Sequence, residues 1–136
     1  MVAADGSQAG VDRHAEVAYC LINVGAVRLC LGLSDPPQTS VISRLLYDQE
    51  LFNETGSLIS DTQIALRRDR EERSVLASLA EPSDTPVITL TDGPVELWGA
   101  KGSGEEAHEF ERQLAEYKKS LHQLQQQGAI AAGYVD

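Results

Sequence analysis

The order of strand-like and helix-like segments is the strongest restriction that this sequence places on its fold. Three apolar, strand-like segments come first, and the rest of the chain alternates helix, strand, helix, strand. The expected strands cover residues 2–5, 16–23, 26–33, 87–93 and 129–136, and the expected helices cover residues 61–80 and 105–127. This order predicts an α/β fold, with an antiparallel meander continued into a mixed sheet and helices packed on that sheet. The first and fourth strands are then free to lie parallel and adjacent.

Local signals place the boundaries of these segments. Asn23-Val24-Gly25 interrupts an apolar run, and a glycine accepts the positive φ of a tight turn, so we expect a hairpin there. Residues 38–60 mix apolar and polar side chains, which predicts an irregular insertion carrying a short helix or strand. Ser60 is a candidate N-cap for the first helix, and Gly128 is a candidate C-cap for the second.

The charge of the chain restricts its partners. Its 136 residues include 21 acidic and 11 basic side chains, which gives a formal net charge of −10. Such an excess argues against a broad basic face for nucleic acid, because duplex binding is dominated by phosphate neutralisation. Any contact with nucleic acid is therefore expected to be local or to depend on metal ions.

Cysteine usage and hydropathy restrict the compartment. Cys20 and Cys30 form no CxxC pair and belong to no His/Cys cluster with metal-ligand spacing. No stretch approaches the roughly 20 apolar residues of a membrane span, and the N-terminus lacks the pattern of a signal peptide. We therefore expect a cytoplasmic protein without membrane contact.

Two expected strands end in the same dipeptide, Asp-Gly. Asp5-Gly6 closes the first strand, and Asp92-Gly93 closes the fourth. If these strands are parallel neighbours, both carboxylates emerge at the sheet edge where α/β proteins usually bind ligands. Clustered carboxylates suit hard divalent cations, and a glycine after the acid would leave room for a metal or a phosphate. The alternative is that both acids simply form turns.

The first expected helix carries a run of alternating charges at residues 67–73. Most of this run is expected to be a solvated face stabilised by pairs four residues apart. Glu72 differs, because it continues the apolar stripe of Val75, Leu76 and Leu79. An acid on that stripe is costly to bury unless it meets a cation, so Glu72 is a candidate third ligand, with Glu71 as the alternate.

Other candidate residues carry weaker signals. Arg13 and His14 follow the first Asp-Gly and could contact a phosphate, although a loop histidine is more often simply exposed. Trp98 and Tyr47 are expected to be packing residues rather than stacking platforms, since aromatic residues make up 5% of the chain.

The ordered set of motifs resembles the NurA nuclease domain family over nearly the whole chain. The resemblance lies in Asp5-Gly6-Ser7-Gln8, Arg13-His14, Leu21-Ile22-Asn23-Val24-Gly25, the helix rich in arginine and glutamate, Leu90-Thr91-Asp92-Gly93 with Trp98, and Ala132-Gly133-Tyr134-Val135. Membership would imply a ribonuclease H-like fold. It would also imply a manganese-dependent deoxyribonuclease, with 5′–3′ exonuclease and single-strand endonuclease activity, acting in DNA end resection and repair.

The resemblance also implies site residues, cofactors and partners. Asp5, Asp92 and Glu72, or Glu71 in place of Glu72, would match the metal-binding acids of the family. Two Mn²⁺ ions, with Mg²⁺ as an alternative, would then support phosphodiester hydrolysis: Asp5 would bind both, and Asp92 and Glu72 one each. The implied partners are DNA, a HerA-type hexameric ATPase that acts as a translocase, and a second copy of the protein.

The family's domain differs from this chain in extent. It continues beyond the Gly-Tyr strand and contributes a later histidine and tyrosine to its site. Residues 1–136 are therefore expected to be a NurA-like core that is incomplete at the C-terminus and at the N-terminus, and the isolated piece is expected to be impaired in activity. A second hypothesis is a non-catalytic ribonuclease H-like module that binds a hexameric ATPase, for which the apolar insertion at residues 41–52 would be an interface.

Overall fold

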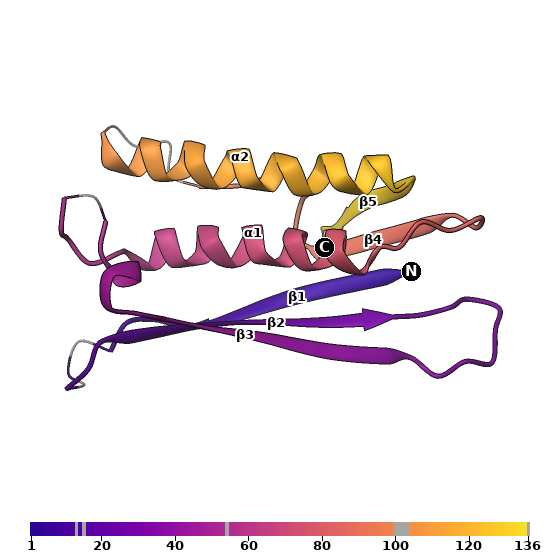
Figure 1. The fold of residues 1–136 in the computed structure, drawn as a ribbon, viewed down its shortest axis with the longest axis horizontal. Coiled ribbons are helices and arrows are strands. Elements are labelled where there is room, and N and C mark those ends of the chain that lie inside the picture. Colours follow the sequence, from indigo (N-terminus) through magenta and orange to yellow (C-terminus); the bar gives the residue numbers. More distant parts are fainter. Residues whose placement is uncertain (13, 15, 54, 100–103, 136) are drawn as a thin grey trace.

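The computed structural model describes residues 1–12, 14, 16–53, 55–99 and 104–135. In these residues the elements follow the order β1, β2, β3, a 3₁₀ helix, α1, β4, α2, β5 (Figure 1). Their bounds are β1 Val2–Ala9, β2 Tyr19–Arg28, β3 Gln38–Tyr47, the 3₁₀ helix Asp48–Leu51, α1 Asp61–Leu79, β4 Val87–Asp92, α2 Glu105–Gln126 and β5 Ala129–Tyr134.

The strands of the described residues form one mixed sheet in the order β3-β2-β1-β4-β5. β1 is antiparallel to β2, and β2 is antiparallel to β3, so the first three strands form a meander. β4 is parallel to β1 on one side and to β5 on the other. The prediction of an α/β fold with parallel, adjacent first and fourth strands is confirmed.

Both helices lie on the same face of the sheet (Figure 1). The main hydrophobic core fills the space between α1 and the first two strands, where Val2 and Ala4 of β1 meet Ile64 and Leu76 of α1. α2 packs beside α1, and Leu124 reaches Ala77 and Ala80 at the end of α1. Among the residues that the structure describes, no helix lies on the opposite face of the sheet.

The predicted hairpin at Asn23-Val24-Gly25 is wrong. β2 runs straight through these residues, and Gly25 pairs with Asp5 on one side and with Val41 on the other. Burial alternates without a break from Cys20 to Ala26, which is the period of a continuous strand that buries one face. The asparagine and glycine suggested a turn, but Gly25 keeps an extended backbone.

The third strand lies within the segment that was expected to be an irregular insertion. β3 spans Gln38–Tyr47, whereas residues 29–37, which the sequence placed partly in a strand, connect β2 to β3. Every residue of β3 except Leu46 is exposed, because β3 is an edge strand that neither helix covers. A strand without a buried face lacks the alternation by which strands are recognised in a sequence.

The helix ends follow the expected capping residues. The Ser60 hydroxyl accepts a hydrogen bond from the Gln63 backbone N–H, and the Gln63 side chain accepts one from the Ser60 N–H, which forms a capping box. Gly128 has φ 72° and follows the C-cap of α2. In the part of the chain that the structure describes, neither helix is long and apolar enough to cross a membrane.

Candidate functional site

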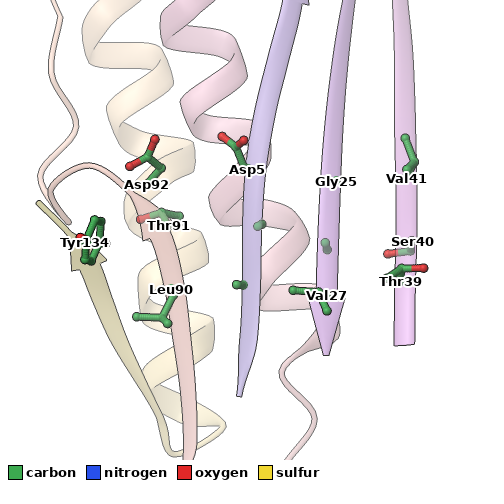
Figure 2. Close-up of a pocket in the computed structure, with 13 residues that line it drawn as sticks. Asp5, Gly25, Val27, Thr39, Ser40, Val41, Leu90, Thr91, Asp92 and Tyr134 are labelled. Carbon is green, nitrogen blue, oxygen red and sulfur yellow. The ribbon is translucent and has the colours of Figure 1, made fainter. Parts of the chain in front are cut away.

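Asp5 and Asp92 occupy neighbouring positions on two adjacent parallel strands. The last residue pair in the β1–β4 register is Ala4 with Thr91, and each aspartate is the next residue on its strand. Figure 2 shows the two carboxylates at a similar level of the sheet, Asp92 at the end of β4 and Asp5 partway along β1. Asp92 ends β4 as predicted, but β1 continues to Ala9 along β2, so Asp5 lies within its strand. The predicted end of β1 at Asp5 is therefore wrong, although the expected proximity of the two acids does not depend on it.

A pocket of about 360 Å³ opens beside these residues on the helix side of the sheet. It is lined by five acidic and two basic residues, Asp5, Asp69, Glu72, Asp92, Glu96, Arg68 and Arg73. With all of them ionised, the formal charge of this lining is −3. We call this space the acidic pocket. All three acids selected from the sequence, Asp5, Asp92 and Glu72, line it.

Glu72 reaches the pocket from α1 and is only 6% exposed. Its carboxylate accepts a hydrogen bond from the Gly6 backbone N–H and lies 3.5 Å from Nε of Arg68. Burial, together with the nearby Asp69 and Asp5 carboxylates, raises the pKa of Glu72 from 4.5 to about 7, against the opposing effects of Arg68 and the Gly6 N–H. Near neutral pH, Glu72 therefore holds a proton in about half of the molecules.

Gly6 leaves room for Glu72 rather than for a ligand. A Cβ atom at position 6 would overlap Oε1 of Glu72 and would lie 2.6 Å from Cγ of Arg68. The expectation that this glycine keeps space for a metal or a phosphate is corrected, because side chains of α1 already occupy that space. Gly93 has a different role: its φ of 88° is a conformation that other residues rarely adopt.

The remaining candidates lie away from the acidic pocket. Glu71 points toward β3, where it accepts a hydrogen bond from Arg44 at 2.7 Å, so Glu72 is the glutamate at the pocket. His14 is exposed and does not line this pocket. Arg13 lies outside the described residues.

Arg73 is a residue of the pocket that sequence reasoning missed. It is 1% exposed, and its guanidinium donates to Oγ1 of Thr91 at 2.8 Å and to the hydroxyl of Tyr117 at 2.9 Å. The Tyr117 hydroxyl in turn donates to the carbonyl of Val95 at 2.6 Å. These bonds tie α1, β4, α2 and the segment after β4 together beneath the pocket. In the sequence, Arg73 is one of several charged residues in a row, and nothing distinguishes it from its neighbours. Its burial is explained by its partners Thr91 and Tyr117, which are 18 and 44 residues away.

Trp98 also departs from expectation. The sequence predicted a packing residue, but the indole is 69% exposed and lines the acidic pocket. Tyr47 is likewise exposed, on the edge strand β3. A low aromatic content therefore did not indicate burial of these two rings.

A second, mostly apolar hollow of about 540 Å³ lies on the sheet face that carries no helix (Figure 2). Its walls include Gly25, Val27, Val41, Leu90 and Tyr134. Asp5, Thr91 and Asp92 line this hollow as well as the acidic pocket. The two aspartates can therefore be approached from both faces of the sheet.

The donor set of the acidic pocket suits a hard divalent cation, since Asp5, Asp92 and Glu72 offer only carboxylate oxygens. Within residues 1–12, 14, 16–53, 55–99 and 104–135, however, no three His, Cys, Asp or Glu side chains are gathered closely enough to hold a metal ion. The acids thus share a pocket, while Glu72 is held by Gly6 and Arg68 rather than turned toward both aspartates.

Comparison with known proteins gives no match to a family model, to a curated protein or to a solved structure.

Proposed function

We propose that this chain is the core of a metal-dependent deoxyribonuclease of the NurA type with a ribonuclease H-like fold. The observation that carries the proposal is the common pocket of Asp5, Asp92 and Glu72, which come from two adjacent parallel strands and the helix packed on them. A meander followed by alternating helices and strands, with the first and fourth strands adjacent, supports the ribonuclease H-like assignment.

Asp5, Asp92 and Glu72 would hold Mn²⁺ or Mg²⁺, provided that the Glu72 carboxylate turns from Gly6 and Arg68 toward the two aspartates. A divalent cation held there would supply a Lewis acid for the phosphodiester and would lower the pKa of a bound water. The protein's own contribution is to place two carboxylates at neighbouring positions of two parallel strands and a third, from α1, beside Gly6. Glu72 must lose its proton to act as a ligand, so cation affinity is expected to rise as the pH increases through about 7.

The charge of the pocket explains why a cation would be needed. A lining with a formal charge of −3 when fully ionised repels a phosphodiester, and it belongs to a chain whose total net charge is −10. Bound divalent ions reverse the sign of the local field. Cation binding and substrate binding are therefore expected to be linked in this protein.

The deciding experiment compares Asp5→Asn, Asp92→Asn and Asp84→Asn. Asp84 is an exposed acid in the loop before β4, and its substitution is the matched control. We expect calorimetric titration with Mn²⁺ to show saturable binding to the wild type and to Asp84→Asn, and loss of binding in the two site variants. Hydrolysis of a labelled single strand is expected to follow the same pattern. Cation binding or hydrolysis that is unchanged in Asp5→Asn would overturn the proposal.

A second candidate function is a non-catalytic module that binds a HerA-type hexameric ATPase. The observation that favours it is the edge strand β3, where Val41, Ile42, Leu45 and Tyr47 are exposed. An uncovered edge also offers backbone N–H and C=O groups to a strand from a partner. If Mn²⁺ does not bind, and Val41→Lys abolishes copurification with the ATPase, the module hypothesis replaces the nuclease.

A further inference from the structure

We infer that Trp98 is a stacking platform for an unpaired base of a nucleic acid strand whose phosphate occupies the acidic pocket. This inference rests on the proposed function and adds a base-binding subsite to it. Trp98 lies in the segment between β4 and α2, which packing and hydrogen bonds hold against the helices.

The residues on both sides of Trp98 are anchored in the protein. Leu97 is buried and packs with Leu66 and Tyr117. A Cβ atom at Gly99 would lie 2.6 Å from Cδ2 of Phe110, so the backbone of Gly99 is tightly packed against α2. Because both neighbours face the helices, the side chain of Trp98 is directed outward, and its exposure of 69% follows from the packing of this segment.

The first residues of this segment, next to β4, are also held in place by hydrogen bonds. The Val95 carbonyl accepts the hydrogen bond from Tyr117, which is itself held by Arg73. Gly93 donates its backbone N–H to the Tyr134 carbonyl at 2.8 Å. The indole is therefore presented by a segment that is hydrogen-bonded to α2 and β5, and stacking on it would cost little conformational entropy.

The indole lies in the same pocket as the carboxylates, which favours a nucleotide over an aromatic ligand that has no phosphate. Trp98 lines the same pocket as Asp5, Glu72 and Asp92, so one nucleotide can place its phosphate at the cation site and its base on the ring. Arg68, which also lines the pocket and forms an ion pair with Asp69 at 2.7 Å, adds a partly exposed guanidinium near that phosphate. Bases inside a duplex are covered on both faces by their neighbours, whereas unpaired bases expose a face that can stack.

The chain contains one tryptophan and four tyrosines, so fluorescence excited selectively at tryptophan reports on this subsite alone. We would titrate the protein, with Ca²⁺ present, with oligo(dT) of about ten nucleotides and with an abasic strand of equal length and charge. Oligo(dT) is expected to change the fluorescence at saturation, whereas the abasic strand leaves it unchanged. Equal changes with the two strands, or no change at saturating oligo(dT), would overturn the stacking subsite.

Variants measured with a fluorescently labelled oligo(dT) provide the second test. Trp98→Leu is expected to weaken binding about tenfold, Trp98→Tyr to retain most of the affinity, and the control Tyr47→Leu to match the wild type. Tyr47 is an exposed aromatic on β3 that does not line the acidic pocket. Since Trp98 is exposed, we expect thermal unfolding of all three variants to resemble that of the wild type.

The outcomes separate this inference from the proposed function. If oligo(dT) binds equally to the wild type and to Trp98→Leu, while Asp5→Asn abolishes Mn²⁺ binding, the stacking subsite is wrong and the nuclease proposal stands. If the wild type binds neither Mn²⁺ nor oligo(dT), both are wrong. Loss of oligo(dT) affinity in Trp98→Leu, with Mn²⁺ binding retained, supports both.

Discussion

The carboxyl group of Glu72 is buried beside Asp69 and Asp5, with the Arg68 guanidinium and the Gly6 N–H as its favourable partners. Its raised pKa means that the folded protein binds a proton more tightly than the unfolded chain does. A carboxyl group must be ionised to bind a divalent cation. A bound cation would therefore offset the burial and the carboxylate repulsion that favour the neutral form of Glu72 in the free protein. Glu72 therefore lowers the stability of the free protein near neutral pH.

The first prediction concerns the pH dependence of this effect. Between about pH 4.5 and 7 the folded state holds a proton on Glu72 that the unfolded state has lost, so the free energy of unfolding falls as the pH rises through this range. The full loss for this one group is at most about 3 kcal/mol. Glu72→Gln does not titrate, and its side-chain oxygen can still accept the Gly6 N–H.

Urea unfolding at about pH 5 and about pH 8, without divalent cations, checks this prediction. The stability of Glu72→Gln relative to the wild type should increase by about 1–3 kcal/mol from the lower to the higher pH. Glu106→Gln, an exposed substitution on α2, is the control and should show a smaller change. A relative stability of Glu72→Gln that is the same at both pH values would contradict the prediction.

Gly133 and Gly25 both lie in strands, but an added Cβ atom would have different neighbours at the two positions. This difference leads to the second prediction. A Cβ at Gly133 would overlap the Gly93 carbonyl oxygen, whereas a Cβ at Gly25 would lie 3.8 Å from the Asp5 carbonyl oxygen, an ordinary contact. Gly133→Ala should lower the free energy of unfolding by about 1–3 kcal/mol, because the chain after β4 must move. Gly25→Ala should leave stability unchanged or raise it by several tenths of a kcal/mol. Equal melting temperatures for the two variants would show that the close approach at Gly133 is unimportant.

At the scale of elements, Arg73 joins α1 to β4 through Thr91 and to α2 through Tyr117. Tyr117 in turn holds the segment between β4 and α2 through the Val95 carbonyl. Its side chain also lies over the Tyr117 ring, with the guanidinium carbon 5.3 Å from the ring centroid. A double-mutant cycle should therefore show that Arg73 and Tyr117 act together. Arg73→Met is expected to cost about 2–4 kcal/mol and Tyr117→Phe about 1–3 kcal/mol, because each leaves buried polar groups without a partner.

The two substitutions combined should cost less than the sum of the single changes. A coupling of about 1 kcal/mol or more in urea unfolding would support a shared network, and additivity within about 0.5 kcal/mol would contradict it. Arg44→Met provides the comparison, because Arg44 is an exposed arginine whose ion pairs with Glu50 and Glu71 lie on the other side of α1. Exposed pairs of this kind contribute little, so its cost should stay below about 1 kcal/mol.

The sequence indicated those elements that have one buried face. α1 has an apolar stripe, and Glu72 was identified because it continues the part of this stripe that packs on the sheet. β4 was recognised as a β-branched run, although its buried side chains are those of Thr89 and Thr91. The hairpin prediction failed because Asn23 and Gly25 are turn-forming types, although the alternation of Cys20, Ile22 and Val24 continues past them. β3 gave no pattern because it has almost no buried side. Arg73 could not be recognised because its burial depends on Tyr117 and Thr91, which are distant in the sequence.

At the scale of the whole molecule, acidic residues outnumber basic ones by ten, and the acidic pocket adds a local concentration of carboxylates. Proteins that bind nucleic acid through many lysines and arginines lose affinity steeply with salt, because each phosphate contact releases a counterion. Here two arginines, Arg68 and Arg73, line the pocket, and Arg73 is buried. Binding of a single strand should therefore depend on divalent ions and on base stacking rather than on a large electrostatic surface.

The last prediction follows from this charge distribution. With Ca²⁺ present, the logarithm of the affinity for oligo(dT) should fall with the logarithm of NaCl concentration with a slope no steeper than about −1.5, because each phosphate neutralised on a single strand contributes about −0.7. With EDTA in place of Ca²⁺, binding should be lost, since the acidic pocket then repels the phosphate. Anisotropy titrations over a series of salt concentrations measure both quantities. A slope of about −4 or steeper, or full affinity in EDTA, would show that the strand follows a basic surface elsewhere on the molecule rather than the pocket of Asp5, Glu72 and Asp92.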